Sequence, residues 1–80
     1  MNKELIKDRT NLLINLENIT TEEVKEYCKK YNIPILTNKK CMFAGLHKAR
    51  IYSIDKGITK NMKDKSKKWL KNNGFSEFIF

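Results

Sequence analysis

The sequence has few of the residues from which catalytic and metal sites are built. It contains one histidine, two cysteines and one proline among 80 residues, and it shows no glycine-rich phosphate loop and no nucleophile motif. Three potential zinc ligands, Cys28, Cys41 and His47, are present, but their spacing is irregular. We therefore expect no enzymatic activity, no metal or other cofactor, and no small-molecule substrate.

Long apolar runs are also absent. No stretch approaches the roughly 20 consecutive apolar residues that span a bilayer, and Met1 to Glu4 lead into charge rather than into the apolar core of a signal peptide. We expect no membrane partner and a cytoplasmic location, which is the host-cell cytoplasm if the chain is phage-encoded. In that reducing compartment the two cysteines are expected to be free thiols.

Acidic residues are scarce in the second half of the chain. The chain carries 17 Lys and Arg against 9 Asp and Glu, a formal net charge of +8, and residues 41–80 hold nine of these bases but only three of the acids. Such an uneven excess favours a polyanionic partner, most often nucleic acid. The alternative is that the charge only keeps the surface solvated.

Apolar residues recur at helical spacing in four segments. We predict a mainly α fold, in which residues 1–80 form one small domain with helices over about 3–16, 21–31, 39–52 and 60–73. The last residues, Ser76 to Phe80, are apolar enough to form a short C-terminal strand or a tail packed on the core, or else an exposed aromatic patch.

Residues that can cap helices precede three of these segments. Thr20 and Glu23 have the spacing of a capping box. Thr37 or Asn38 can cap the third helix, and Thr59 can cap the fourth.

The glycines are expected to serve two purposes. Gly57 and Gly74 follow helical patterns and are predicted to take the left-handed conformation that ends a helix. Gly45 lies inside the third helix, where glycine costs about 1 kcal/mol relative to alanine. We interpret Gly45 as a site where another helix crosses closely.

The connection between the second and third helices contains the only proline. Pro34 has no N–H and disfavours a helical Ile33, which predicts an extended connection. Ile33, Ile35 and Leu36 are expected to offer their side chains to the core.

Lys39 and Lys40 follow the predicted cap of the third helix. Cations are unfavourable at a helix start, where exposed N–H groups and the dipole favour anions. A bound phosphate would account for both lysines. His47 shares with Lys40 the face that we expect to be exposed, and it could touch the phosphate; a solvated surface histidine is the alternative.

The fourth helix has a lysine-rich face opposite Met62, Trp69 and Asn73. Lysine contacts predict sequence-tolerant and salt-dependent binding, whereas base readout usually uses Arg, Asn or Gln. A solvated helix face is again the alternative. The lysines of this face are Lys60, Lys63, Lys67 and Lys71.

Residues Thr20 to Ile33, with the sequence TTEEVKEYCKKYNI, resemble the first helix of the SAP, LEM and related helix-extended-helix modules. That helix ends in a glycine–isoleucine step, and Asn32 stands at the glycine position. The segment from Lys39 to Phe43 is similar to the lysine-rich start of the second helix, although the acidic and basic residues usual later in that helix are missing. The resemblance covers about residues 19–50. It implies DNA binding through the linker and the second helix start, but LEM-type members bind a protein instead.

The sequence therefore predicts a nucleic-acid-binding protein of low sequence specificity, with duplex DNA as the favoured ligand. An alternative from another class is a phage or mobile-element accessory protein that binds and inhibits a host protein, possibly a nucleic-acid enzyme, through Ile14 and Phe78 to Phe80. The predicted nucleic-acid contacts are Thr37, Asn38, Lys39, Lys40, His47, Lys60, Lys63, Lys67 and Lys71.

Overall fold

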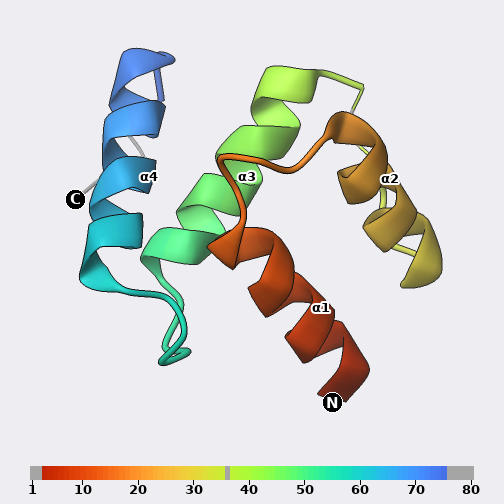
Figure 1. Ribbon diagram of the computed structural model, residues 1–80. Coiled ribbons are helices and arrows are strands. Elements are labelled where there is room, and N and C mark those ends of the chain that lie inside the picture. Colours follow the sequence, from red (N-terminus) through yellow and green to blue (C-terminus); the bar gives the residue numbers. More distant parts are fainter. Residues whose placement is uncertain (1–2, 36, 76–80) are drawn as a thin grey trace.

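The computed structural model describes residues 3–35 and 37–75. Within these residues the predicted mainly α fold is confirmed, and no strand is present. Each helix begins where the sequence predicts and ends one or two residues earlier. The predicted C-terminal strand or packed tail at residues 76–80 lies outside the described residues. The four helices are α1 (Lys3–Ile14), α2 (Thr21–Lys30), α3 (Lys39–Ile51) and α4 (Lys60–Asn72) (Figure 1).

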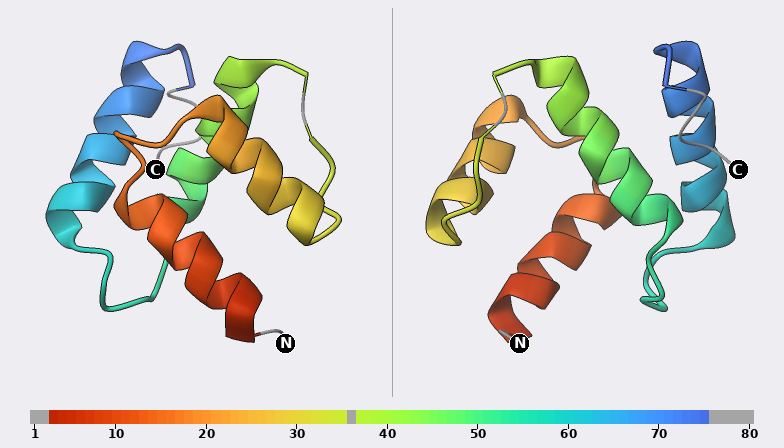
Figure 2. Two further views of the ribbon diagram at one scale, coloured as in Figure 1. Left: turned by 45° about the vertical axis from the view of Figure 1, so that its right-hand side comes forward. Right: turned by 180° about the vertical axis from the view of Figure 1, so that it is seen from behind.

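Helix α3 is the central element. Figures 1 and 2 show it between α4 on one side and α2 on the other, while α1 crosses below. The buried residues of α3 accordingly occupy more than one face: Met42 is buried, and so are Ala44, His47 and Arg50. No helix in the described part of the chain is long and apolar enough to cross a membrane.

The space between α2 and α3 is filled by an apolar cluster. Val24, Cys28 and Met42 are buried at its centre. Partly buried side chains that pack around them are Ile19, Tyr27, Phe43 and Leu46. The other buried apolar residues are Leu13, Leu16, Ala44, Ile58 and Leu70.

The predicted caps are present. The hydroxyl oxygen of Thr20 accepts a hydrogen bond from the backbone N–H of Glu23 at 3.2 Å, and the N–H of Met62 donates to the Thr59 hydroxyl at 3.2 Å. Of the two candidates for α3, Asn38 is the cap: its side-chain oxygen accepts from the N–H of Cys41 at 3.1 Å. These bonds fix where the helices begin.

Two helices end in the same way. Asn32 and Gly74 have φ values of 55° and 85°. In each case the next residue donates its N–H to a carbonyl five residues earlier, from Ile33 to Cys28 and from Phe75 to Leu70, both at 2.8 Å. This is the Schellman pattern, so Asn32 adopts the left-handed conformation expected at the glycine position.

The extended connection after α2 differs from the prediction in its packing. Ile33 and Ile35 keep 36% and 37% of their surfaces exposed, so the prediction that they enter the core is wrong. The apolar cluster between α2 and α3 is already filled by side chains of the helices themselves and the turn before α2. Leu36, predicted to join them, lies outside the described residues.

Gly57 was predicted to take the left-handed conformation, but its φ is not positive. Gly74 is the one glycine in the described residues with a positive φ. A Cβ added to Gly57 would lie 3.2 Å from Cδ1 of Ile14 and 3.1 Å from a carboxylate oxygen of Asp55. The N–H of Gly57 donates to that same oxygen at 2.8 Å. Gly57 is therefore needed for close approach rather than for a left-handed turn.

Gly45 lies on the exposed side of α3, and nothing lies within 4 Å of an added Cβ. The predicted close helix crossing at this position is wrong.

We expect Gly45→Ala to raise the free energy of unfolding by roughly 0.5–1 kcal/mol, because alanine favours the helix and meets no neighbour. Urea denaturation followed by circular dichroism measures this change. Gly74→Ala is the matched control: it adds the same methyl group at a φ of 85° and should lower stability. A loss of stability in Gly45→Ala would show that α3 is crowded there after all.

Candidate functional site

A groove of about 570 Å³ lies where the start of α3 meets the end of α4 and the turn after α1. Its volume is in the range of ligand sites. Lysine, aromatic and amide side chains form its walls together with one carboxylate. The lining residues are Leu16, Glu17, Ile19, Lys39, Lys40, Phe43, His47, Trp69 and Asn73.

A second groove of about 560 Å³ lies between α1 and α2 and has the opposite character. Asp8, Glu23 and Glu26 line it. Its lysine, Lys30, already pairs with Glu4 at 2.7 Å and with Asp8 at 3.1 Å. This acidic groove is unsuited to a polyanion, which leaves the α3–α4 groove as the candidate site.

The first turn of α3 forms the positive rim of the candidate groove. Lys39 and Lys40 are exposed, and no acid occurs in this turn; by contrast, α2 begins with Glu22 and Glu23. The Asn38 cap satisfies the N–H of Cys41, while the first N–H groups of a helix have no internal partner. The dipole, these amides and two ammonium groups all favour an anion here. Thr37 is exposed immediately before the cap.

Stacked rings form one wall of the groove. The ring of Trp69 stacks on His47 at a centroid distance of 4.3 Å and on Phe75 at 6.1 Å. Asn73 donates its side-chain N–H to the carbonyl of Trp69 at 2.8 Å. Because both Trp69 contacts are near-parallel, at 19° and 11°, they hold the indole in a fixed orientation.

His47 is buried, with 3% of its surface exposed, and the prediction of an exposed histidine beside Lys40 is wrong. The side of α3 that the sequence pattern left to solvent packs against α4. Burial lowers the pKa of His47 to about 4, and the nearby Arg50 charge adds to this effect. The imidazole is therefore neutral at pH 7 and supplies no positive charge to a phosphate.

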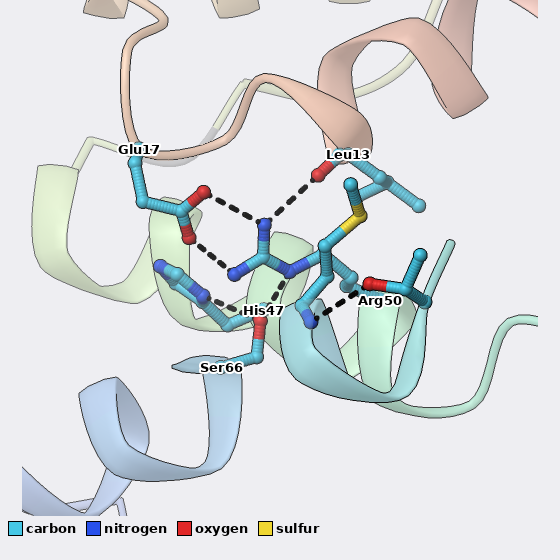
Figure 3. Close-up of polar contacts among 7 residues, drawn as sticks. Leu13, Glu17, His47, Arg50 and Ser66 are labelled. Atoms are coloured by element: carbon cyan, nitrogen blue, oxygen red, sulfur yellow. Dashed lines mark hydrogen bonds and ion pairs between the residues drawn. The ribbon is translucent and has the colours of Figure 1, made fainter. Parts of the chain in front are cut away.

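Arg50 lies behind the groove and is completely buried. Its Nε donates to the Ser66 hydroxyl at 2.6 Å, and its Nη1 donates to the Leu13 carbonyl at 3.1 Å. The guanidinium also pairs in bidentate fashion with the Glu17 carboxylate (Figure 3). One side chain thus joins α1, α3 and α4.

Ser66 links this guanidinium to His47. Its hydroxyl oxygen, which accepts from Arg50, lies 2.9 Å from Nδ1 of His47. The Ser66 O–H can donate to Nδ1, which leaves the ring proton of the neutral histidine on Nε2. In the described part of the chain, every buried side-chain nitrogen and oxygen has a hydrogen-bond partner.

Sequence reasoning missed the role of Arg50. Arg9, the other arginine of the sequence, is exposed. The available signal was the position of Arg50, which is four residues after Leu46 and eight after Met42, on the apolar face of α3. A charged residue at such a position needs hydrogen-bond acceptors and a counterion for its buried donors.

Glu17 is the one acid in the groove wall. The hydrogen bond from Arg50 holds the pKa of Glu17 below its ordinary value, in spite of the opposing effect of burial, and the charges of Arg50 and Lys65 act in the same direction. The carboxylate is thus already paired with a cation and opposes a bound anion less than a free acid would.

The predicted lysine face of α4 does not line the groove. At about 100° per residue, its four lysines lie roughly 120–180° around the helix axis from Trp69. Lys65 lies only about 40° from Trp69 around the helix axis, and its charge helps to lower the pKa of Glu17, but it does not line the groove. The structure therefore brings Lys39 and Lys40 together at the groove, whereas the four predicted lysines of α4, Lys60, Lys63, Lys67 and Lys71, do not line it.

No group of three or more possible metal ligands occurs among residues 3–35 and 37–75. Cys28 is buried and Cys41 is exposed, and both are free. Burial raises the pKa of the Cys28 thiol, which makes it a poor nucleophile.

Comparisons of the chain with protein-family models, with curated proteins and with solved structures find no match. The resemblance of residues 19–50 to SAP and LEM modules therefore stays a prediction.

We expect Arg50→Ala to lower the free energy of unfolding by roughly 3–5 kcal/mol, because the change leaves a cavity and removes the partner of the Leu13 carbonyl and of Glu17. Arg9→Ala is the control and should change stability by less than about 0.5 kcal/mol, since Arg9 is exposed. Denaturant titration measures both. Equal, small effects would mean that the buried network contributes nothing.

Stability is also expected to depend on pH through His47, the only histidine. Between pH 6.5 and about 4 the unfolded chain binds a proton at His47 that the folded chain does not, so the free energy of unfolding falls as pH drops through this window. The total loss is roughly 3 kcal/mol. Glu17, with its lowered pKa, adds a further loss in more acidic solution.

Urea midpoints at pH 7.5, 6 and 5 measure this effect. His47→Gln should flatten the dependence between pH 7.5 and 5, whatever its own stability. A wild-type midpoint that does not change over this range would contradict a buried, neutral histidine.

Proposed function

We propose that this protein binds nucleic acid, with duplex DNA as the favoured form, through phosphate contacts of low sequence specificity. The observation that carries the proposal is the first turn of α3. This turn is capped by Asn38, contains no acid and exposes Lys39 and Lys40 at the rim of a groove.

The chemistry of this turn fits a phosphate rather than a base. Backbone N–H groups and ammonium groups bind phosphate oxygens without reading sequence. The buried, neutral His47 adds no charge, and the completely buried Arg50 is committed to Glu17, Ser66 and Leu13. The cations that remain on the groove side are lysines, which favour sequence-tolerant binding.

The aromatic wall favours duplex over single-stranded nucleic acid. Binding of single strands commonly uses an open aromatic face on which bases stack. The ring of Trp69 already stacks on His47 and on Phe75, so part of its surface is used within the protein. Paired bases in a duplex need no such platform.

The alternative of an inhibitor of a host protein depends on two apolar contacts. Ile14 is half-buried and its Cδ1 lies near Gly57, which leaves little of it for a partner. The other contact, Phe78 to Phe80, lies outside the described residues. The described surface therefore supports the nucleic-acid proposal better.

Fluorescence anisotropy with labelled duplex DNA, single-stranded DNA and RNA across a salt series tests the proposal. We expect the duplex to bind most tightly and affinity to fall steeply with salt. The double variant Lys39→Glu/Lys40→Glu should weaken duplex binding by about tenfold or more and reduce the slope of log K against log salt by about 2, one for each lost phosphate contact.

The matched control is Lys25→Glu/Lys29→Glu, which makes the same change in net charge on the exposed face of α2. Lys30 is unsuited as a control because it pairs with Glu4 and Asp8. Equal losses of affinity in both double variants would show that net charge alone explains the binding, and the start of α3 would no longer be the proposed site. An absence of binding even at low salt would end the nucleic-acid proposal.

A further inference from the structure

The loop between α3 and α4 presents apolar side chains to water. In Figures 1 and 2 this loop, drawn in green to cyan, extends beyond the adjoining ends of both helices. Ile54 is 100% exposed and Tyr52 is 54% exposed. No other large apolar residue in the described part of the chain is as exposed as Ile54.

The loop is nevertheless held in place by its neighbours. Asp55 accepts hydrogen bonds at its carboxylate from Thr10 of α1 at 3.3 Å and from the N–H of Gly57 at 2.8 Å. The N–H of Asp55 donates to the Ser53 hydroxyl at 3.2 Å. Ile58 is buried, with 5% of its surface exposed, and its N–H donates to the Asp55 carbonyl at 3.1 Å.

This anchoring makes Ile54 a preorganised contact. A side chain on an unanchored loop would lose conformational freedom on binding, whereas the bonds of Asp55 and the burial of Ile58 have already restricted this loop. The exposed isoleucine then gains the full benefit of leaving water when a partner covers it.

The charges around the loop indicate the chemistry of that partner. Lys56 and Lys60 are exposed. Of the nearby acids, Asp55 is occupied by hydrogen bonds, and the exposed Asp64 lies on the lysine face of α4, where the four lysines outnumber it. From Lys60 to Lys71 the lysine face of α4 extends for about 16 Å at 1.5 Å per residue. One DNA strand presents a phosphate every 3.4 Å of helix axis, so this row spans about five phosphates. Ile54 is a single apolar side chain, which fits the space between two stacked base pairs. The row of α4 lysines fits the phosphates of the adjoining strand, and this arrangement suits duplex DNA better than a planar anionic membrane.

We propose that Ile54 inserts between adjacent base pairs from the minor groove of duplex DNA and bends the duplex, while the α4 lysines follow one strand. Apolar wedges of this kind unstack a base step and kink the helix. This inference rests on the proposed nucleic-acid binding and gives the lysine face of α4, which lies outside the groove, a role of its own.

Two readouts on duplex DNA at saturating protein test the insertion. End-to-end energy transfer in a doubly labelled duplex of about 30 base pairs reports bending, and a 2-aminopurine placed within the duplex brightens when its step is unstacked. Wild-type protein should increase both signals. Ile54→Ala should abolish both and weaken duplex affinity by about tenfold.

Ile6→Ala is the control, since it shortens an isoleucine of α1, away from the loop and the linker, and should leave both signals at saturating protein unchanged. If Ile54→Ala binds, bends and unstacks DNA as wild type does, the insertion is wrong while the proposed function stands. If wild-type protein binds no duplex, the proposed function fails first. In that case, the protein would be sedimented with phosphatidylserine vesicles. Sedimentation that is lost in Ile54→Ala would assign the loop to a membrane surface and overturn the inference.

Discussion

The buried guanidinium of Arg50 is the interaction on which the arrangement of the helices depends. A small chain can bury only a limited core, and here a charged side chain occupies its centre and bonds to α1, α4 and the turn after α1 at once. Such a group is costly to bury unless its donors are satisfied. Because its partners come from separate parts of the chain, the helices must meet in one relative position to satisfy it.

This network also shapes the candidate groove. Glu17 and His47 line the groove on one side and connect to Arg50 on the other, His47 through Ser66. The groove therefore has a wall in which the acid is paired and the histidine is neutral. Its positive charge comes from Lys39 and Lys40 alone at the rim, so the part of the site that faces a ligand is separate from the part that holds the fold together.

The sequence was informative where the structure is determined locally. Thr20, Asn38 and Thr59 cap helices, and Asn32 ends one, because each acts on backbone within a few residues. The exposed position of Lys39 and Lys40 in the first turn of α3 is set locally as well. Features set by packing were missed: α3 packs on two sides, which buries His47 and Arg50, while Gly45 and the isoleucines of the linker stay exposed. Helical periodicity shows that a helix has an apolar face but not how many neighbours it will have. The contribution of Phe43 and Trp69 to the groove could not be predicted without knowing that α4 ends beside the start of α3.

The burial of the only histidine has a consequence for how binding responds to its surroundings. Histidine is the side chain whose ordinary pKa lies between about 5 and 8. Because the pKa of His47 in the folded protein is about 4, its charge does not change in this range. The side chains of the folded protein then keep their formal net charge of +8 between about pH 5 and 8. Attraction to a polyanion then follows ionic strength, through screening and counterion release, and is indifferent to the acidity of the compartment.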